Sequence, residues 1–176
     1  MNTFEFYKYI YDRELNRRSK LDESINPIVG IISLLVAYLS YFFTNKEYSI
    51  IIECNIIIWT FITLIISCVA ISIVFLVKSY NNYLRGFDYP NIAYLKLIRT
   101  FETQTLPEYN SKVSTSEKIE FENDLIDRLV RIADENTKIN DTRAYSMYVA
   151  KTFVIIALTF LFLTTIIIIT KNSQLC

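Results

Sequence analysis

The stretch NIIIWTFITLIISCVAISIVFLV, Asn55 to Val77, holds 23 residues without a single charge. At about 1.5 Å of rise per residue, a helix of this length crosses a hydrocarbon core of about 30 Å. Two further uncharged runs are Pro27 to Thr44 and Thr152 to Thr170. Continuous runs of Ile, Leu, Val and Phe favour helices over the alternating strands of a membrane barrel. The sequence therefore predicts a membrane protein with three transmembrane helices.

The composition of the chain favours an all-α fold. Apolar residues fill 52% of the 176 positions, and 2 glycines and 3 prolines leave few places where a helix must stop. We expect an amphipathic N-terminal helix over residues 1–25 and a two-helix membrane hairpin over residues 26–77. A small helical cytosolic domain is expected over residues 78–151, and a third transmembrane helix with a short tail over residues 152–176.

The charged and reactive residues exclude several classes of function. Lysine and arginine equal aspartate and glutamate at 18 each, so we expect no direct binding of RNA or DNA. Cys54, Cys68 and Cys176 match the spacing of neither a metal cluster nor a disulfide framework. The chain has no histidine, no glycine-rich phosphate loop and no nucleophile elbow. We therefore expect no enzyme activity, no catalytic residue, no metal and no cofactor.

Basic and aromatic residues predict the orientation of the spans. Four basic residues lie close together between residues 13 and 20, ahead of the first run, whereas Lys46 alone lies in the connection after it. The four are Arg13, Arg17, Arg18 and Lys20. Because positive charge in short flanks stays inside, the N-terminus and residues 78–151 are predicted to be cytoplasmic. Aromatic residues at the end of the first run and the start of the second are predicted to share one interface level. They are Tyr41, Phe42, Phe43 and Trp59.

The residues before the first span have an amphipathic pattern. Phe4, Tyr7, Tyr11 and Leu15 recur at spacings of three and four, as on one face of a helix. Three placements are open for this face. It lies on the membrane surface, packs against a partner subunit, or packs against the polar block of its own chain.

Local signals predict helices inside the polar block. The second span is expected to continue to about Leu84, and a further helix to cover residues 91–105. That helix should end before Pro107, because the residue ahead of a proline is biased away from helix. Residues 108–113 are then expected to reverse the chain.

Ser114 and Glu117 form a capping box, which predicts the start of a further helix. Apolar residues between Ile119 and Ala133 cover an arc of about 180° on this helix, with charged residues opposite. Glu122 falls inside the arc, either at a solvent-exposed edge or facing a cationic partner. The polar stretch NTKINDT that follows leaves open whether residues 114–170 form one bent helix or two.

The first two spans carry stripes of small residues at helical spacing. One stripe consists of Gly30, Ser33, Ala37 and Ser40, and the other contains Thr60, Thr63 and Ser67. Small residues let neighbouring helices approach closely. Either they pack the three helices of one protomer together, or they join protomers into a homo-oligomer in the lipid bilayer. In the second case Thr60, Thr63 and Ser67 line the inner wall.

Three segments resemble small helical membrane effectors of bacterial anti-phage defence. They are YDRELNRRSKLDES (Tyr11 to Ser24), FENDLIDRLVRIADEN (Phe121 to Asn136) and NDTRAYSMYVAK (Asn140 to Lys151). The arrangement looks most like the membrane accessory protein of type VI-B CRISPR systems, and more loosely like SLATT-type effectors. The resemblance implies an oligomeric assembly in the bacterial inner membrane. It would permeabilise or depolarise the membrane once a partner RNA-guided ribonuclease has met phage RNA.

The same resemblance implies a divergent HEPN-like region, whose ribonuclease motif pairs an arginine with a histidine. Arg143 matches the arginine, but no histidine follows it. We therefore expect Arg143 to be structural, bonding Asp141 or neighbouring carbonyls, and to mark an oligomer or partner face together with Glu122. The competing hypothesis is a non-conducting membrane anchor or scaffold whose cytosolic helices recruit a partner protein.

Overall fold

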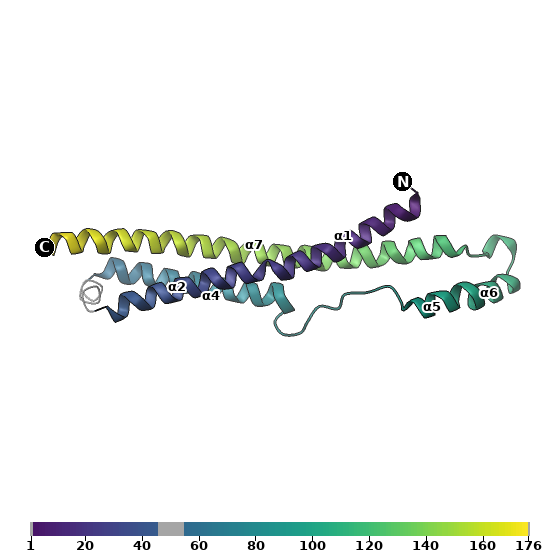
Figure 1. Ribbon diagram of the computed structural model, residues 1–176, viewed down its shortest axis with the longest axis horizontal. Helices are drawn as coiled ribbons and strands as arrows, with labels where there is room; N and C mark the ends of the chain where they lie inside the picture. The colour runs from purple at the N-terminus through teal and green to yellow at the C-terminus, as the bar shows by residue number, and fades with distance from the viewer. Residues whose placement is uncertain (1, 46–54, 176) are drawn as a thin grey trace. The chain divides into compact units, whose positions relative to one another are not determined.

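The computed structural model describes residues 2–45 and 55–175, with side chains as far as Lys171. Every regular element in this part of the chain is helical (Figure 1). The long helices are α1 (Thr3–Glu23), α2 (Ile25–Thr44), α4 (Ile56–Asn81) and α7 (Phe121–Leu175). The short ones are α5 (Leu95–Thr100), the π-helix η1 (Phe101–Thr105), α6 (Leu106–Lys112) and the 3-10 turn η2 (Thr115–Glu117). Lys46, Cys54 and Cys176, which the predictions above use, lie outside the described residues.

Three helices are long and apolar enough to cross a membrane, which confirms the all-α class and the three candidate spans. The first candidate lies within residues 3–44, the second is α4, and the third lies in the later part of α7.

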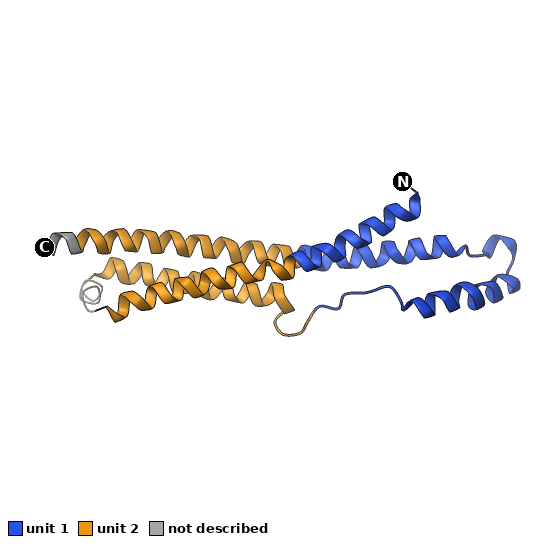
Figure 2. Cartoon of the chain, in the orientation of Figure 1, with its two compact units in different colours: residues 1–20, 87–141 blue, residues 21–86, 142–176 orange. Residues whose placement is uncertain are grey.

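The chain divides into two compact units (Figure 2). Unit 1 contains residues 1–20 and 87–141, and unit 2 contains residues 21–86 and 142–176. Unit 1 joins the N-terminal helix to the polar block: the Asn140 side-chain amide donates a hydrogen bond of 3.0 Å to the Glu14 carbonyl oxygen. Of the three placements open for the N-terminal helix, the structure therefore has the one against its own polar block.

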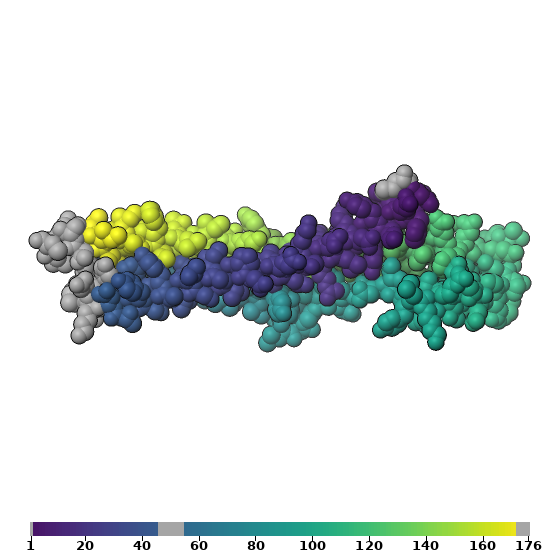
Figure 3. Space-filling model, in the orientation of Figure 1, coloured from purple at the N-terminus to yellow at the C-terminus, as the bar shows by residue number. Residues whose placement is uncertain are grey.

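The core of unit 2 is a seam in which buried positions alternate at spacings of four and three. On α4 the buried seam residues are Ile58, Ile62, Ile65, Val69, Ser72, Leu76 and Ser79. α2 and α7 follow the same spacing, with Ile28, Ile32, Leu35 and Phe42 on α2 and Met147, Ala150, Val154, Ala157, Thr164 and Ile168 on α7. A repeat of about 3.5 residues is the pattern of left-handed helix packing. In the space-filling view, α2 and the yellow end of α7 cover much of the visible side of unit 2 (Figure 3).

Two serines of α4 tie this seam to the backbone of α7. The buried Ser72 hydroxyl donates to the Ala150 carbonyl oxygen at 3.1 Å, and the Ser79 hydroxyl donates to that of Arg143 at 3.0 Å. These bonds fix the register of α4 against α7.

Replacing Ser72 with alanine should lower the free energy of unfolding in detergent by about 0.6 kcal/mol, the mean value for interhelical hydrogen bonds in a membrane protein. The change removes the bond to Ala150 and leaves little empty space. Thermal unfolding followed by far-UV circular dichroism measures it, with Ser111→Ala as the control, because the exposed Ser111 hydroxyl bonds within α6. Equal stability loss in both variants would contradict the assigned interhelical bond.

α4 ends at Asn81, three residues before the predicted end near Leu84. Asn82, Tyr83 and Leu84 have positive φ angles of 50°, 57° and 70°, and Gly86 follows at 78°. The left-handed conformation costs non-glycine residues roughly 1–2 kcal/mol each, and it stops the helix. The Asn81 carboxamide oxygen accepts from the Leu84 N–H at 2.9 Å, which stabilises the turn locally.

The predicted helix over residues 91–105 is wrong at both ends. Residues 91–94 are not helical, and the chain stays helical through Pro107 to Lys112. Pro107 lies in the first turn of α6, directly after the π-helix η1. A proline is tolerated in a first turn because its missing N–H has no partner to lose there. The chain therefore reverses after residue 112 rather than within residues 108–113.

The capping box is present, but it closes only the short turn η2. The Ser114 N–H donates to Glu117 Oε2 at 3.4 Å, and the Ser114 hydroxyl donates to the same oxygen at 2.9 Å. Lys118 is already extended, and the long helix α7 begins at Phe121 instead of Ser114. NTKINDT does not interrupt α7, so the question left open by the sequence is answered as one helix.

Candidate functional site

The two predicted stripes of small residues lie on the outside of unit 2. All seven residues are exposed in the protomer: Gly30, Ser33, Ala37 and Ser40 on α2, and Thr60, Thr63 and Ser67 on α4. At about 100° per residue, each stripe lies on the face of its helix opposite the buried seam. A Cβ built on Gly30 meets open space. Packing of the helices within one protomer therefore does not use these stripes.

The hydroxyl groups of the α4 stripe bond to their own helix. Thr60 donates to the Ile56 carbonyl oxygen at 2.9 Å, and Thr63 donates to that of Trp59 at 2.9 Å. Ser67 continues the series with a bond of 2.8 Å to Thr63. Their donors are satisfied, while the hydroxyl oxygens keep acceptor capacity toward the outside. The stripe is consequently a weakly polar face that hydrocarbon, another helix or water can cover.

Aromatic residues gather where α2 ends and α4 begins. The Phe43 and Trp59 rings lie 5.9 Å apart, centre to centre. Tyr41 is exposed, whereas Phe42 is buried in the core against Ile58 and its neighbours. The ring contact brings two of the four predicted interface aromatics together, and their depth in a bilayer stays a prediction.

Arg143 is buried in unit 2 with only 2% of its surface exposed. Its guanidinium forms an ion pair with Asp22 and donates from Nε to the Ser79 carbonyl oxygen at 2.8 Å. The prediction of a carbonyl partner is confirmed, but Asp141 instead pairs with Arg17. Arg143 is thus enclosed within its own protomer, and its place at an oligomer or partner face stays a prediction.

A second buried polar group centres on Glu14 in unit 1. Glu14 is 2% exposed, and its carboxylate accepts from Arg13 at 3.0 Å and from the Asn140 side-chain amide at 3.1 Å. Tyr89 donates its hydroxyl to Asn140 Oδ1 at 2.8 Å. Glu14 and Asn140 were missed by the sequence reasoning. Continuing the alternating spacing of four and three from Phe4 and from Leu129 would have placed both on the buried face.

Arg17 links this group to the surface of unit 1. It pairs with Asp141 at 2.5 Å and with Glu14 at 3.5 Å. Partial burial opposes its charge, but the hydrogen bond and charge of Asp141, together with Glu14, raise the pKa of Arg17 above its ordinary value. A raised folded-state pKa means that the stabilisation is complete at neutral pH and is lost only in strongly alkaline solution.

Glu122 is exposed in the first turn of α7. This is the solvent-reaching alternative of the two that the sequence left open. A carboxylate in the first helical turn also interacts favourably with the helix dipole.

Unit 1 contains two adjoining apolar cavities, of about 270 Å³ and about 540 Å³. Both are lined by residues of α5 and α7, and they share Ile92, Ile98, Phe121 and Leu125. The larger one also reaches α1. Arg128 lines the smaller cavity, where its guanidinium lies 4.9 Å from the Phe101 ring centre and bonds to Asp124 at 2.7 Å. Such a surface suits an apolar partner better than a polar substrate.

No group of three or more Cys, Asp or Glu side chains that could hold a metal ion occurs among residues 2–45 and 55–171. The candidate site is therefore a pair of surfaces: the outward stripes of unit 2 and the apolar cavities of unit 1. Comparison of the chain with protein-family models, curated proteins and solved structures gave no match, so its function is inferred from these residues.

Proposed function

We propose that the chain is a homo-oligomeric membrane protein that permeabilises or depolarises the membrane when it is triggered. The observation that carries this proposal is the outward position of Thr60, Thr63 and Ser67 on α4. Small hydroxylated faces gain little from lipid, but they allow close helix packing or a wall that water can wet. Because side chains fill the seam between the three helices of one protomer, several protomers have to enclose any aqueous route.

The stripe on α2 supports the association of protomers. Gly30 and Ala37 let a neighbouring backbone approach closely, and open space surrounds Gly30. One protomer thus has two different outward stripes, on α2 and on α4. Contact between unlike surfaces of successive copies is heterologous, and such contacts close into rings when the rotation permits.

The family resemblance supports a setting in bacterial anti-phage defence, where a partner RNA-guided ribonuclease that has met phage RNA supplies the trigger. The distribution of basic residues supports an inner-membrane orientation with the N-terminus and residues 78–151 in the cytoplasm. In this orientation unit 1 is the part that receives the trigger.

The variants Thr63→Leu and Ser67→Leu should abolish depolarisation without destabilising the protomer, because both positions are exposed. Leucine would fill the weakly polar wall with apolar bulk. The measurement uses a potential-sensitive dye in cells that express the chain with an RNA-guided ribonuclease and its target transcript.

Thr159→Leu is the matched control, since it makes the same change at an exposed threonine of α7. It should depolarise like the wild type. An unchanged potential in triggered wild-type cells would refute the proposal. A monomeric mass of the detergent-solubilised protein would also refute the proposal, because one protomer cannot form a pore.

A second candidate function is a non-conducting anchor or scaffold that recruits a partner protein. The apolar cavities of unit 1 favour it, together with the exposed side chains of Tyr94, Leu95 and Leu97 beside them. In that case the stripe variants would leave the membrane potential unchanged, and substitutions at Leu97 or Ile98 would abolish recruitment.

A further inference from the structure

We propose that the turn after α4 anchors unit 2 at the bilayer interface by inserting among the headgroups of anionic phospholipids. The turn comprises residues 80–86 and is called the interface turn below. This inference rests on the membrane placement in the proposed function. It adds a specific lipid-contacting surface and the chemistry of the lipid.

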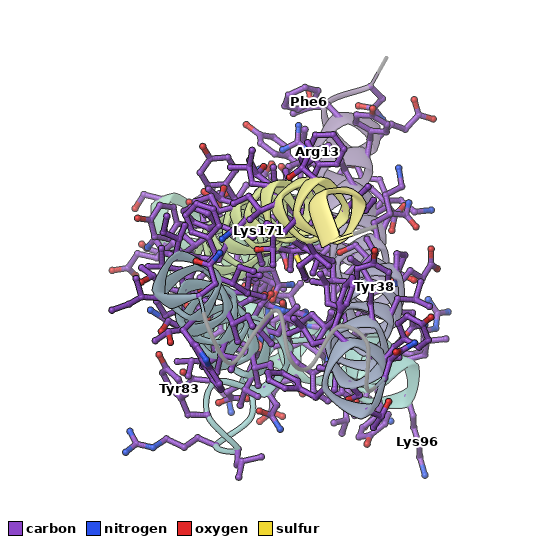
Figure 4. All side chains as sticks on the ribbon, turned by 90° about the vertical axis from the view of Figure 1, so that its left-hand side faces the viewer. Phe6, Arg13, Tyr38, Tyr83, Lys96 and Lys171 are labelled. Atoms are coloured by element: carbon purple, nitrogen blue, oxygen red, sulfur yellow. The ribbon has the colours of Figure 1, made fainter. Side chains whose placement is uncertain are left out.

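The interface turn presents large side chains outward from a constrained backbone. Leu84 is 83% exposed, and Tyr80 and Tyr83 are also exposed. Tyr83 points away from the helices of unit 2 (Figure 4). The positive φ angles of Tyr83 and Leu84 are held by hydrogen bonds within the turn, including Gly86 N–H to the Asn81 carbonyl oxygen at 2.8 Å. In water this arrangement would combine backbone strain with an exposed leucine, whereas the acyl–headgroup boundary would bury that leucine.

A neighbouring helix presents two exposed tyrosines within about two helical turns of this level. The bond from the Ser79 hydroxyl to the Arg143 carbonyl oxygen, 3.0 Å long, sets the end of α4 beside residue 143 of α7. Tyr145 and Tyr148, just beyond it on α7, are both exposed. Tyrosines with an apolar ring and a polar tip are enriched at the level of lipid headgroups. The interface turn is therefore one part of a tyrosine belt formed by two helices.

The distance along α4 matches one bilayer. From Trp59 to Tyr80 there are 21 residue steps, which at about 1.5 Å each span about 32 Å. This length equals the hydrocarbon thickness that a spanning helix has to cross. Trp59 and Phe43 then lie at the opposite interface.

The interface turn carries a positive charge. Arg85 is the only charged residue of the interface turn, and it is exposed. Lys78 lies two residues before the interface turn. Its ammonium is 5.9 Å from the centre of the Phe75 ring, so its stem covers apolar surface. Basic side chains beside tyrosines at the end of a span suit phosphate groups of anionic lipids.

A single tryptophan at position 84 tests the anchor. Trp59 is the only native tryptophan, so the double variant W59F/L84W reports on the turn alone. The full chain is reconstituted into vesicles of phosphatidylcholine with phosphatidylglycerol. The introduced indole should emit at shorter wavelength than in water, and lipids brominated near the headgroup should quench it more than lipids brominated deep in the chain.

The matched control is W59F/L95W, because Leu95 is 84% exposed and lies in unit 1. The indole of this control should emit as in water and resist both quenchers. W59F/Y83W provides a second reporter if the first variant misfolds. Water-like emission from the reporter in the interface turn would overturn the anchor, provided that Trp59 of the wild type is quenched. If Trp59 is also unquenched, the membrane placement itself fails.

The lipid class is tested by Arg85→Gln in the W59F/L84W background. Loss of the positive charge should reduce the headgroup-level quenching in anionic vesicles and leave it unchanged in pure phosphatidylcholine. If W59F/L84W is quenched equally with and without Arg85→Gln, in anionic vesicles as well as in pure phosphatidylcholine, the assignment to anionic headgroups is overturned.

Discussion

Replacing Asp22 with alanine is expected to lower the free energy of unfolding by about 3 kcal/mol, since removing one partner of a buried ion pair costs roughly 3–5 kcal/mol. Arg143 would keep the Ser79 carbonyl as an acceptor but lose the carboxylate that balances its charge. Asp22 is itself 47% exposed, which places the effect at the lower end of this range. Thermal unfolding in detergent, followed by far-UV circular dichroism, measures the change.

The double variant D22A/R143M is the decisive control. Methionine removes the unbalanced charge and keeps much of the apolar volume, so it should recover most of the stability that D22A loses. If the double variant is as unstable as D22A plus R143M together, the two side chains do not act as a pair.

Replacing Glu14 with alanine is expected to destabilise unit 1 by about 2–3 kcal/mol, the cost of leaving a buried polar group without its charged partner. Arg13 and Arg17 can turn to water, but the buried amide of Asn140 loses its carboxylate acceptor. Amide hydrogen exchange of residues 87–141 should accelerate, while that of α4 should not. This readout separates a local effect from global unfolding.

Asp12→Ala makes the comparable change at an exposed acidic residue of the same helix. A surface substitution of this kind should stay within about 0.5 kcal/mol of the wild type. Similar exchange rates in the two variants would show that the Glu14 network adds nothing to the stability of unit 1.

The sequence predicted the spans but not the faces that pack. The uncharged runs were sufficient for three candidate transmembrane helices, because length and apolarity alone decide that question. Inside such a run nearly every position is apolar, so buried Ile62 and exposed Ile66 on α4 carry the same signal. Small residues such as Thr60 and Gly30 were the main contrast available, and the structure places them opposite the packed seam.

The sequence left open whether the polar stretch NTKINDT before the third span interrupts the helix. Asn, Asp and Thr favour helix ends, which made NTKINDT a candidate boundary. Asn136, Asn140 and Arg143 nevertheless follow the spacing of the apolar seam and are buried. Tertiary hydrogen bonds, such as that of Asn140 to Glu14, outweigh the local preference. A test for continued spacing across polar positions would have predicted one helix.

The short helices between α4 and α7 were the least predictable part. Proline signals a helix end when its missing donor and its ring disturb the preceding turn. At Pro107 the π-helix η1 widens that turn, so the helical path continues. Single-residue signals do not reveal such an insertion.

The unbroken course of α7 within unit 2 has a mechanical consequence. Its residues 142–175 include neither glycine nor proline. Kinks in helices arise mainly at those two residues or at π-bulges, so this part of α7 has no built-in hinge. A torque applied near Arg143 would be carried along the axis as rotation of the whole rod. The far end would then respond by turning its outward side chains together, rather than by bending.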